Sequence, residues 1–174
     1  MGRREEMKIK MLFLAGILLA VATMVFTKTL EAGDFPKRVG YVNDFADVFS
    51  PEESLVLEDK IQEFYKKTRI EIIVVTMKSL EEGKRPNEYL QELSEDWKTG
   101  DRSILLLMVP ERERGGAAIN LGSEIKQNFN PVVAWQAVYK DMFPGAMVGQ
   151  ANEGIVKAVQ RIIQYYTEKL GRAL

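Results

Sequence analysis

Two long apolar runs constrain the fold of this chain more than any other feature. The run IEIIVVTM occupies residues 70–77, and SILLLMVP occupies residues 103–110. Both are rich in aliphatic side chains and almost uninterrupted, which is typical of strands that are covered on both faces. A helical pattern separates them, so the two runs predict a parallel β-α-β unit within a sheet that carries helices on both sides.

Helical signals alternate with these strands. Ser50–Glu53, read as SPEE, is typical of an N-terminal capping box, and the apolar positions after it share one helix face as far as about Thr68. A polar loop then leads to a second helix, which Gly100 is expected to stop.

The second half of the chain continues the alternation. Residues 117–121 predict an antiparallel strand that returns from a hairpin. A third helix is expected to open at Asn130-Pro131, to end near Met142 and to be broken by FPGAMVGQ, with Trp135 in or near the core. A long final helix is expected over residues 151–170. Together these elements predict a three-layer α/β/α sandwich with a mixed sheet of about four strands.

The first 32 residues have the pattern of a targeting segment. The basic stretch MGRREEMKIK precedes an uncharged apolar run from Met11 to Thr27, and a small residue follows at Ala32. As a helix, this run would extend about 25 Å, close to the hydrocarbon thickness of a bilayer. Either a cleaved signal peptide or an uncleaved membrane anchor fits, and both place the remainder outside the cytoplasm. The expected organisation is a signal or anchor helix over residues 1–32, a linker over residues 33–40 and a domain over residues 41–171.

Composition excludes several kinds of chemistry. The chain contains no cysteine and no histidine, so disulfides, thiolate metal sites, Ser-His-Asp triads and histidine zinc sites are ruled out. Residues 33–174 hold 19 basic and 22 acidic residues, a net charge of −3. With so small a net negative charge, the sequence shows no excess of basic residues that would indicate nucleic-acid binding. Any catalysis would use carboxylates, lysine, tyrosine, hydroxyl groups or a metal held by oxygen.

Acidic and amide side chains in loops are the candidates for a binding site. Asn43, Asp44 and Asp47 are spaced closely enough to bind a hard metal such as Ca²⁺, but the same residues commonly close turns by bonding to the nearby backbone. Asp101 precedes an expected strand, where a turn residue or an ion-pair partner is common. Glu124 follows another strand, where it would stabilise the positive end of a helical turn.

Several segments together resemble a known family. The stretch VNDFADVFSPEE, its following helix and strand, and then YLQELSEDWKTG, SILLLMVP and INLGSEI follow the order of the TPM domain family. Its members are extracytoplasmic domains related to thylakoid lumen and photosystem II repair proteins. The resemblance covers about residues 39–170. It implies an α/β/α sandwich, a Ca²⁺-type acidic site in some members and acid phosphatase activity in plant relatives.

The resemblance also implies site residues. Asn43 and Asp44 match the Asn-Asp of the family's first loop, and Asp101 and Glu124 lie where the family has acidic residues. On this basis the four residues are the candidate metal ligands, with Ca²⁺ as the candidate cofactor. The chain departs from the family after Asp101, where Arg102 stands in place of the usual Asn-Gly or Asp-Gly, and LGSEI lacks a second glycine.

Three functions remain open at this stage. The targeting segment and the altered acidic loops favour a non-catalytic binding, assembly or maintenance factor for an envelope or membrane protein. The first alternative is a metal-dependent, phosphatase-like enzyme in which Asp44, Asp101 and Glu124 hold the cation, because phosphoryl transfer needs positioned charge. The second is a structural domain that Ca²⁺ stabilises. Contact with the membrane would come through the N-terminal segment if it is not cleaved.

Overall fold

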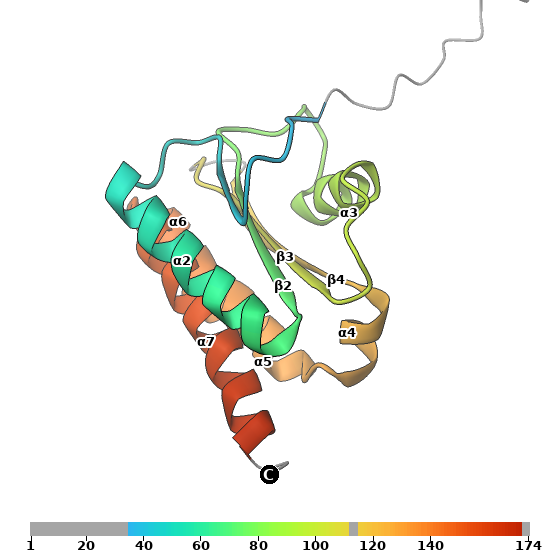
Figure 1. Ribbon diagram of the computed structural model, residues 1–174. Helices are drawn as coiled ribbons and strands as arrows, with labels where there is room; N and C mark the ends of the chain where they lie inside the picture. The colour runs from blue at the N-terminus through green and yellow to red at the C-terminus, as the bar shows by residue number, and fades with distance from the viewer. Residues whose placement is uncertain (1–34, 112–114, 172–174) are drawn as a thin grey trace, which may run out of the picture. The chain divides into compact units, whose positions relative to one another are not determined.

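Four strands form one mixed sheet in the computed structural model, which describes residues 35–111 and 115–171 (Figure 1). The order across the sheet is β1-β2-β3-β4; β1, β2 and β3 are parallel, and β4 runs antiparallel to β3. The strands are β1 (Val42–Asp44), β2 (Glu71–Thr76), β3 (Ser103–Val109) and β4 (Gly116–Leu121). The mixed, four-stranded sheet is therefore confirmed.

Helices cover both faces of the sheet, which confirms the predicted α/β/α sandwich (Figure 1). One face carries α2 (Pro51–Thr68), α7 (Ala151–Gly171) and a continuous helical segment made of α5 (Pro131–Gln136), the π-helix η1 (Ala137–Met142) and α6 (Phe143–Val148). The other face carries α3 (Pro86–Asp96). The short helix α4 (Ser123–Asn128) follows β4 directly.

Alternation along the strands divides the core between the two faces. Ile72 and Val74 of β2 join one cluster with the buried side chains of α2 and α7. Ile73, which lies between them, points to the opposite face because successive side chains of a strand alternate. There α3 contributes its buried residues Tyr89, Leu90 and Leu93. Both faces of β2 and β3 are thus buried, as their apolar runs predicted.

The N-terminus of α2 is built as its sequence predicted. The Ser50 hydroxyl accepts a hydrogen bond from the Glu53 N–H at 3.2 Å, and the Glu53 carboxylate accepts one from the Ser50 N–H at 2.8 Å. Each of these bonds pairs a backbone donor that the first helical turn cannot satisfy itself. Arg69, in a left-handed conformation, ends the helix just after the predicted position.

One strand and two helix ends differ from the sequence-based expectations. Strand β1 lies in a segment for which only turns were expected. The second helix ends at Asp96, and the left-handed residue after it is Lys98 rather than Gly100. The third helix does not break at residue 143: it continues to Val148 and ends at Gly149, whose φ of 77° supplies the left-handed turn. Pro144 is tolerated because it stands in the first turn of α6, directly after the π-helix.

The predicted signal or anchor lies outside the described residues. From Pro36 onward the chain is bonded to the domain: the Trp97 indole N–H donates to the Pro36 carbonyl at 2.9 Å, and Arg38 pairs with Glu71 at 2.7 Å. Over residues 35–111 and 115–171, no helix combines the length and the apolarity that crossing a bilayer requires.

Candidate functional site

Asn43 is fully buried and all of its polar side-chain atoms are bonded. Its Oδ1 accepts from the Val39 N–H at 2.8 Å and the Gly40 N–H at 3.4 Å. Its Nδ2 donates to the carbonyls of Gly40 and Val74, each at 3.1 Å. The side chain therefore joins the start of β1 to β2 and the preceding loop, and no part of it is presented to solvent.

Asp44 holds the loop between β1 and α2. Its two carboxylate oxygens accept hydrogen bonds from the backbone N–H groups of Val48, at 3.1 Å, and Phe49, at 2.9 Å. The Thr76 hydroxyl at the end of β2 donates to the same carboxylate. Asp44 thus closes a turn by bonding to the nearby backbone, which is one of the two roles that its sequence context allowed. Asp47 makes an exposed ion pair with Lys78 at 2.7 Å, which raises the lysine pKa.

Asp101 and Glu124 lie near the start of β3, and each one contacts the residue adjacent to the other in sequence. The Asp101 carboxylate accepts from the Ser123 hydroxyl, and its backbone carbonyl accepts from the Glu124 N–H at 3.1 Å. Glu124 forms an ion pair with Arg102, whose guanidinium also donates to the Thr68 carbonyl at 3.0 Å and to the Arg69 carbonyl at 3.2 Å. These contacts join the ends of α2, β3 and β4.

The four candidate ligands therefore fall into two groups at opposite ends of the sheet. Asp44 is level with Thr76, the last residue of β2, whereas Glu71, its first residue, is level with Ser103. Five residues separate these levels, about 16 Å along a strand. The structure does not bring the four together around one cation, and no group of three or more acidic side chains in the described ranges is arranged to hold one. Binding of a metal by either group stays a prediction.

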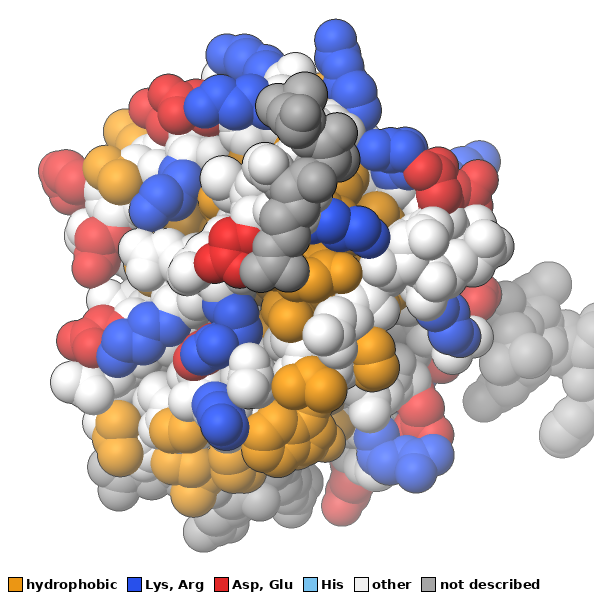
Figure 2. Space-filling view, turned by 90° about the horizontal axis from the view of Figure 1, so that it is seen from below, with side chains coloured by type: hydrophobic (Ala, Val, Ile, Leu, Met, Phe, Trp, Pro, Cys, Tyr) orange, Lys and Arg blue, Asp and Glu red, His pale blue; other side chains and the backbone are white. Residues whose placement is uncertain are grey.

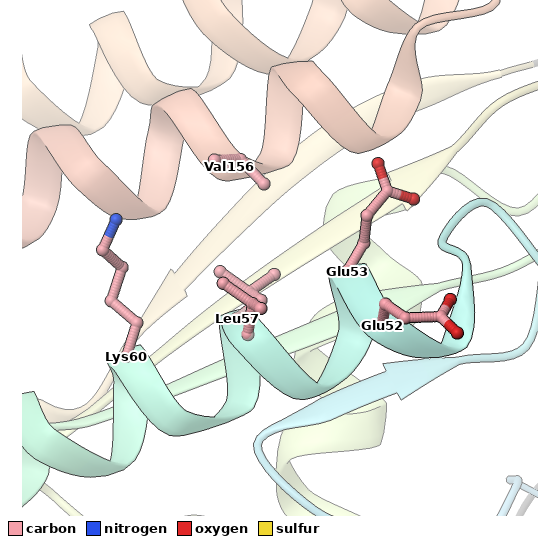
Figure 3. A pocket seen from close by; sticks show the side chains of 6 residues that line it. Glu52, Glu53, Leu57, Lys60 and Val156 are labelled. Carbon is pink, nitrogen blue, oxygen red and sulfur yellow. The ribbon is translucent and has the colours of Figure 1, made fainter.

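A groove between α2 and α7 is the first of two exposed apolar features. Its volume is about 260 Å³. Leu57 on α2 and Val156 on α7 face one another across it, with Glu52 and Glu53 at one end and Lys60 at the other (Figure 3). Val56 also lines it, with 68% of its surface exposed. The groove thus has an aliphatic floor between ends of opposite charge.

The acidic end of the groove is held in place by hydrogen bonds. The second carboxylate oxygen of Glu53 accepts from the Asn152 side-chain amide at 2.9 Å, so Glu53 links the N-termini of α2 and α7. Its bonds with Ser50 and then with Asn152 lower the pKa of Glu53, which keeps the carboxylate ionised. Glu52 next to it makes no ion pair with a described residue. Its charge is therefore available to a group entering the groove.

The second apolar feature is a ridge along the α5–η1–α6 segment. Trp135 and Tyr139 are 52% and 55% exposed, and their rings contact each other with centroids 5.7 Å apart. The ridge also includes Val132, Phe143, Met147 and Val148. Seen from the end of the molecule where α5 lies, hydrophobic side chains gather in the lower part of the view, with a cationic side chain among them (Figure 2).

The π-helix keeps these side chains aligned. Trp135, Tyr139, Phe143 and Met147 are spaced by four residues, a step that overshoots a full α-helical turn by about 40°. In the π-helix η1 the hydrogen bonds join residues five apart, so one turn contains more than four residues. A four-residue step therefore falls short of a full turn there, which offsets the rotation that accumulates along the α-helical parts. The buried side follows the same spacing and consists of Ala137, Val138, Asp141, Met142, Gly145 and Ala146.

Two contacts fix this segment to α7. Buried Asp141 accepts two hydrogen bonds from the Arg161 guanidinium, at 2.5 and 2.8 Å, and these bonds raise the pKa of Arg161. At Gly154 a side chain would come within 2.8 Å of the Asp141 carbonyl, so only glycine permits this approach of α7. The ridge is therefore carried by a firmly packed helix.

The geometry defines the class of the protein. It is an α/β/α sandwich domain in which the acidic loop residues at both ends of the sheet are hydrogen-bonded or ion-paired to other residues of the same domain. A family model described as the TPM domain matches residues 42–165. The chain belongs to the TPM domain family, and the resemblance found in its sequence is confirmed. No match was found among the curated proteins.

Solved structures share the fold. The solution NMR structure of the N-terminal domain of a protein from P. gingivalis aligns with a TM-score of 0.66 and 19% identity, covering 75% of this chain and 84% of that one. The N-terminal domain of cg2496 protein from Corynebacterium glutamicum, also an NMR structure, aligns with a TM-score of 0.58 and 15% identity, covering 76% and 84%. At these identities the likeness concerns the fold alone.

Sequence reasoning missed both apolar surfaces. Trp135 was expected in or near the core, and that expectation was wrong, because its ring lies on the outer side of the helix. A four-residue spacing of large apolar side chains from Trp135 to Met147 was the available signal. In α-helical geometry this spacing drifts by about 40° at each step, so on its own it does not define one face of a helix.

Proposed function

We propose that this TPM domain is an extracytoplasmic, non-catalytic binding factor that assists the assembly or maintenance of another protein of the cell envelope. The α2–α7 groove carries the proposal. It offers a partner a concave, aliphatic surface with charged ends, as sites that take a protruding side chain do. The candidate acids, by contrast, are engaged in bonds that hold the domain's own loops.

The lining of the groove indicates what a partner would present. An aliphatic or aromatic side chain would fill the space between Leu57 and Val156. Glu52 and Lys60, two helical turns apart on α2, would pair with a basic residue on one side of that side chain and an acidic residue on the other (Figure 3). The charges would orient the segment more than they would add affinity, because they lie at the exposed rim.

Val56 and Leu55 provide a matched pair for testing the proposal. Both are aliphatic residues on the first turns of α2, with exposed fractions of 68% and 66%, but only Val56 lines the groove. A photo-crosslinking amino acid at position 56 of the full chain, expressed in its own cells, should capture one discrete envelope protein. The same amino acid at position 55 should capture it weakly or not at all.

A second variant links that capture to the groove. Val56→Asp should abolish copurification of the protein captured from position 56, because it buries a charge against the apolar contact. Leu55→Asp should leave copurification unchanged. Equal labelling from positions 55 and 56, or copurification that survives Val56→Asp, would show that the groove is not the binding surface. Turnover of a phosphomonoester by the purified chain, lost in Asp44→Ala at unchanged folding, would favour the enzymatic alternative instead.

A further inference from the structure

The α5–η1–α6 ridge has the chemistry of a surface that meets lipid. Its exposed side chains combine tryptophan, tyrosine and phenylalanine with methionine and valine. Tryptophan and tyrosine concentrate at the membrane–water interface, because their rings have an apolar body and a polar edge. Helices that lie in this interface have such an apolar stripe on one side and lysine or arginine beside it.

Charge beside the ridge is complementary to lipid headgroups. The Lys140 ammonium lies 5.8 Å from the centre of the Trp135 ring. A hollow of about 170 Å³ at the far end of the ridge is lined by Lys140, Lys157 and Val148. The acids around it, Asp141 and Glu153, are paired with Arg161 and Lys157. Lys140 therefore remains as a cation without an ion-pair partner among the described residues, next to the aromatic pair.

Chain length keeps the domain close to a bilayer if the apolar N-terminal run stays in it. Eight residues, 28–35, separate the end of that run from Pro36, where the domain begins. Fully extended, eight residues reach about 28 Å. This is less than a typical domain diameter, so a surface of the domain would face the headgroups at close range.

The form of the surface favours lipid over a protein partner at this place. The ridge is a row of side chains standing out from one helix. A protein would need a groove of matching shape to receive it, whereas a bilayer interface deforms around any such row. The concave α2–α7 groove is a different surface. Contact of the ridge with lipid is therefore independent of the function proposed above.

We propose that the α5–η1–α6 ridge rests on the surface of a phospholipid bilayer. Trp135, Tyr139 and Phe143 enter the headgroup region, and Lys140 meets the lipid phosphates. The ridge orients the domain on the membrane, and where the N-terminal segment stays in the bilayer the ridge adds a second point of attachment.

Fluorescence of the full chain in vesicles tests this directly, because the chain has two tryptophans, Trp97 and Trp135. Trp97→Phe leaves Trp135 as the only reporter, and Trp135→Phe leaves Trp97. Both variants are reconstituted in vesicles of phosphatidylcholine and phosphatidylglycerol, with plain or brominated acyl chains. Trp135 emission should shift to the blue and be lost with brominated lipid, whereas Trp97 emission should respond to neither. Circular dichroism confirms that both variants are folded.

Two further arms separate the possible occupants. Lys140→Glu should weaken the loss of Trp135 emission, most of all when phosphatidylglycerol is present, and an unchanged loss would contradict the role given to Lys140. Trp135 emission that is the same in plain and brominated vesicles, and that aqueous acrylamide still quenches, would overturn the proposal. Shielding of Trp135 that appears only after envelope proteins are added would overturn it in favour of a protein partner.

Discussion

The two ends of the sheet use the same kinds of residue in different ways. At the end of β1, Asn43 and Asp44 bond mainly to backbone groups that are buried or half-buried. At the start of β3, Asp101 and Glu124 bond to exposed side chains. Loss of a partner at the first end leaves a backbone donor without water, whereas at the second end water replaces it. Loop acids that resemble a metal site can thus be structural. How much each one contributes to the free energy of unfolding depends on whether its hydrogen-bond partner is buried or exposed.

The largest effect is expected from Asn43→Asp. The substitution replaces the Nδ2 donor with an oxygen that faces the Gly40 and Val74 carbonyls, and it places a carboxylate where no solvent reaches. A buried, uncompensated charge costs about 3–5 kcal/mol. The free energy of unfolding from urea titration should fall by that amount. A loss below about 1 kcal/mol would mean that the first end is more open to water than its burial indicates.

Asp44→Ala should come next, with a loss of about 2–3 kcal/mol, because the N–H groups of Val48 and Phe49 and the Thr76 hydroxyl lose a charged acceptor. Urea titration again measures it. Asp44→Asn is the matched control: it keeps one acceptor oxygen and should lose less. Equal losses in the two variants would show that the retained acceptor oxygen contributes nothing, and a loss below about 1 kcal/mol in Asp44→Ala would show that these bonds do not stabilise the loop.

The second end should respond weakly. Glu124→Ala removes an ion pair whose side chains are 43% and 48% exposed, and it should cost no more than about 1 kcal/mol. Arg102→Ala should cost about 1–2 kcal/mol, because it also unpairs the carbonyls of Thr68 and Arg69. If Glu124→Ala proves as costly as Asp44→Ala, the contrast between the two ends does not hold.

The smallest effect is expected from Ca²⁺. A cation that binds only the folded chain would stabilise it by about 2.7 kcal/mol at a hundredfold excess over its Kd. Because the candidate ligands are divided between two ends of the sheet, we expect the same melting temperature in excess Ca²⁺ and in chelator. A rise in Ca²⁺ that Asp101→Asn abolishes but Asp44→Asn does not would assign a metal site to the second end alone.

Strong local patterns were sufficient to predict much of the fold. Some elements can be recognised from neighbouring residues alone. A strand buried on both faces requires a continuous apolar run, as in β2 and β3, and a helix cap requires particular residues three positions apart, as at Ser50. Strand β1 has no such local pattern. It is three residues long, two of them are Asn43 and Asp44, and it is a strand only because β2 lies beside it.

The role of the loop acids depended on distant contacts. Asp44 was open to either interpretation from sequence, and its Thr76 partner lies 32 positions away. The separation of Asp44 from Glu124 follows from the antiparallel direction of β4, which returns the chain to the start of β3. The resemblance to the family placed these acids in one site. Distances along the sheet, which no spacing in the sequence reports, show two locations.

The π-helix makes the ridge depend on the number of residues in the segment as well as on their identity. If η1 became a regular α-helix with all of its residues kept, each of those residues would turn the chain by about 100°. The twelve steps from Trp135 to Met147 would then leave Met147 about 120° away from Trp135, although every ridge side chain was kept. Loss of one η1 residue outside the ridge would shorten the path to eleven steps and bring Met147 back to within about 20° of Trp135. A one-residue length difference here between related chains would therefore mark a change between π-helix and α-helix that preserves the ridge.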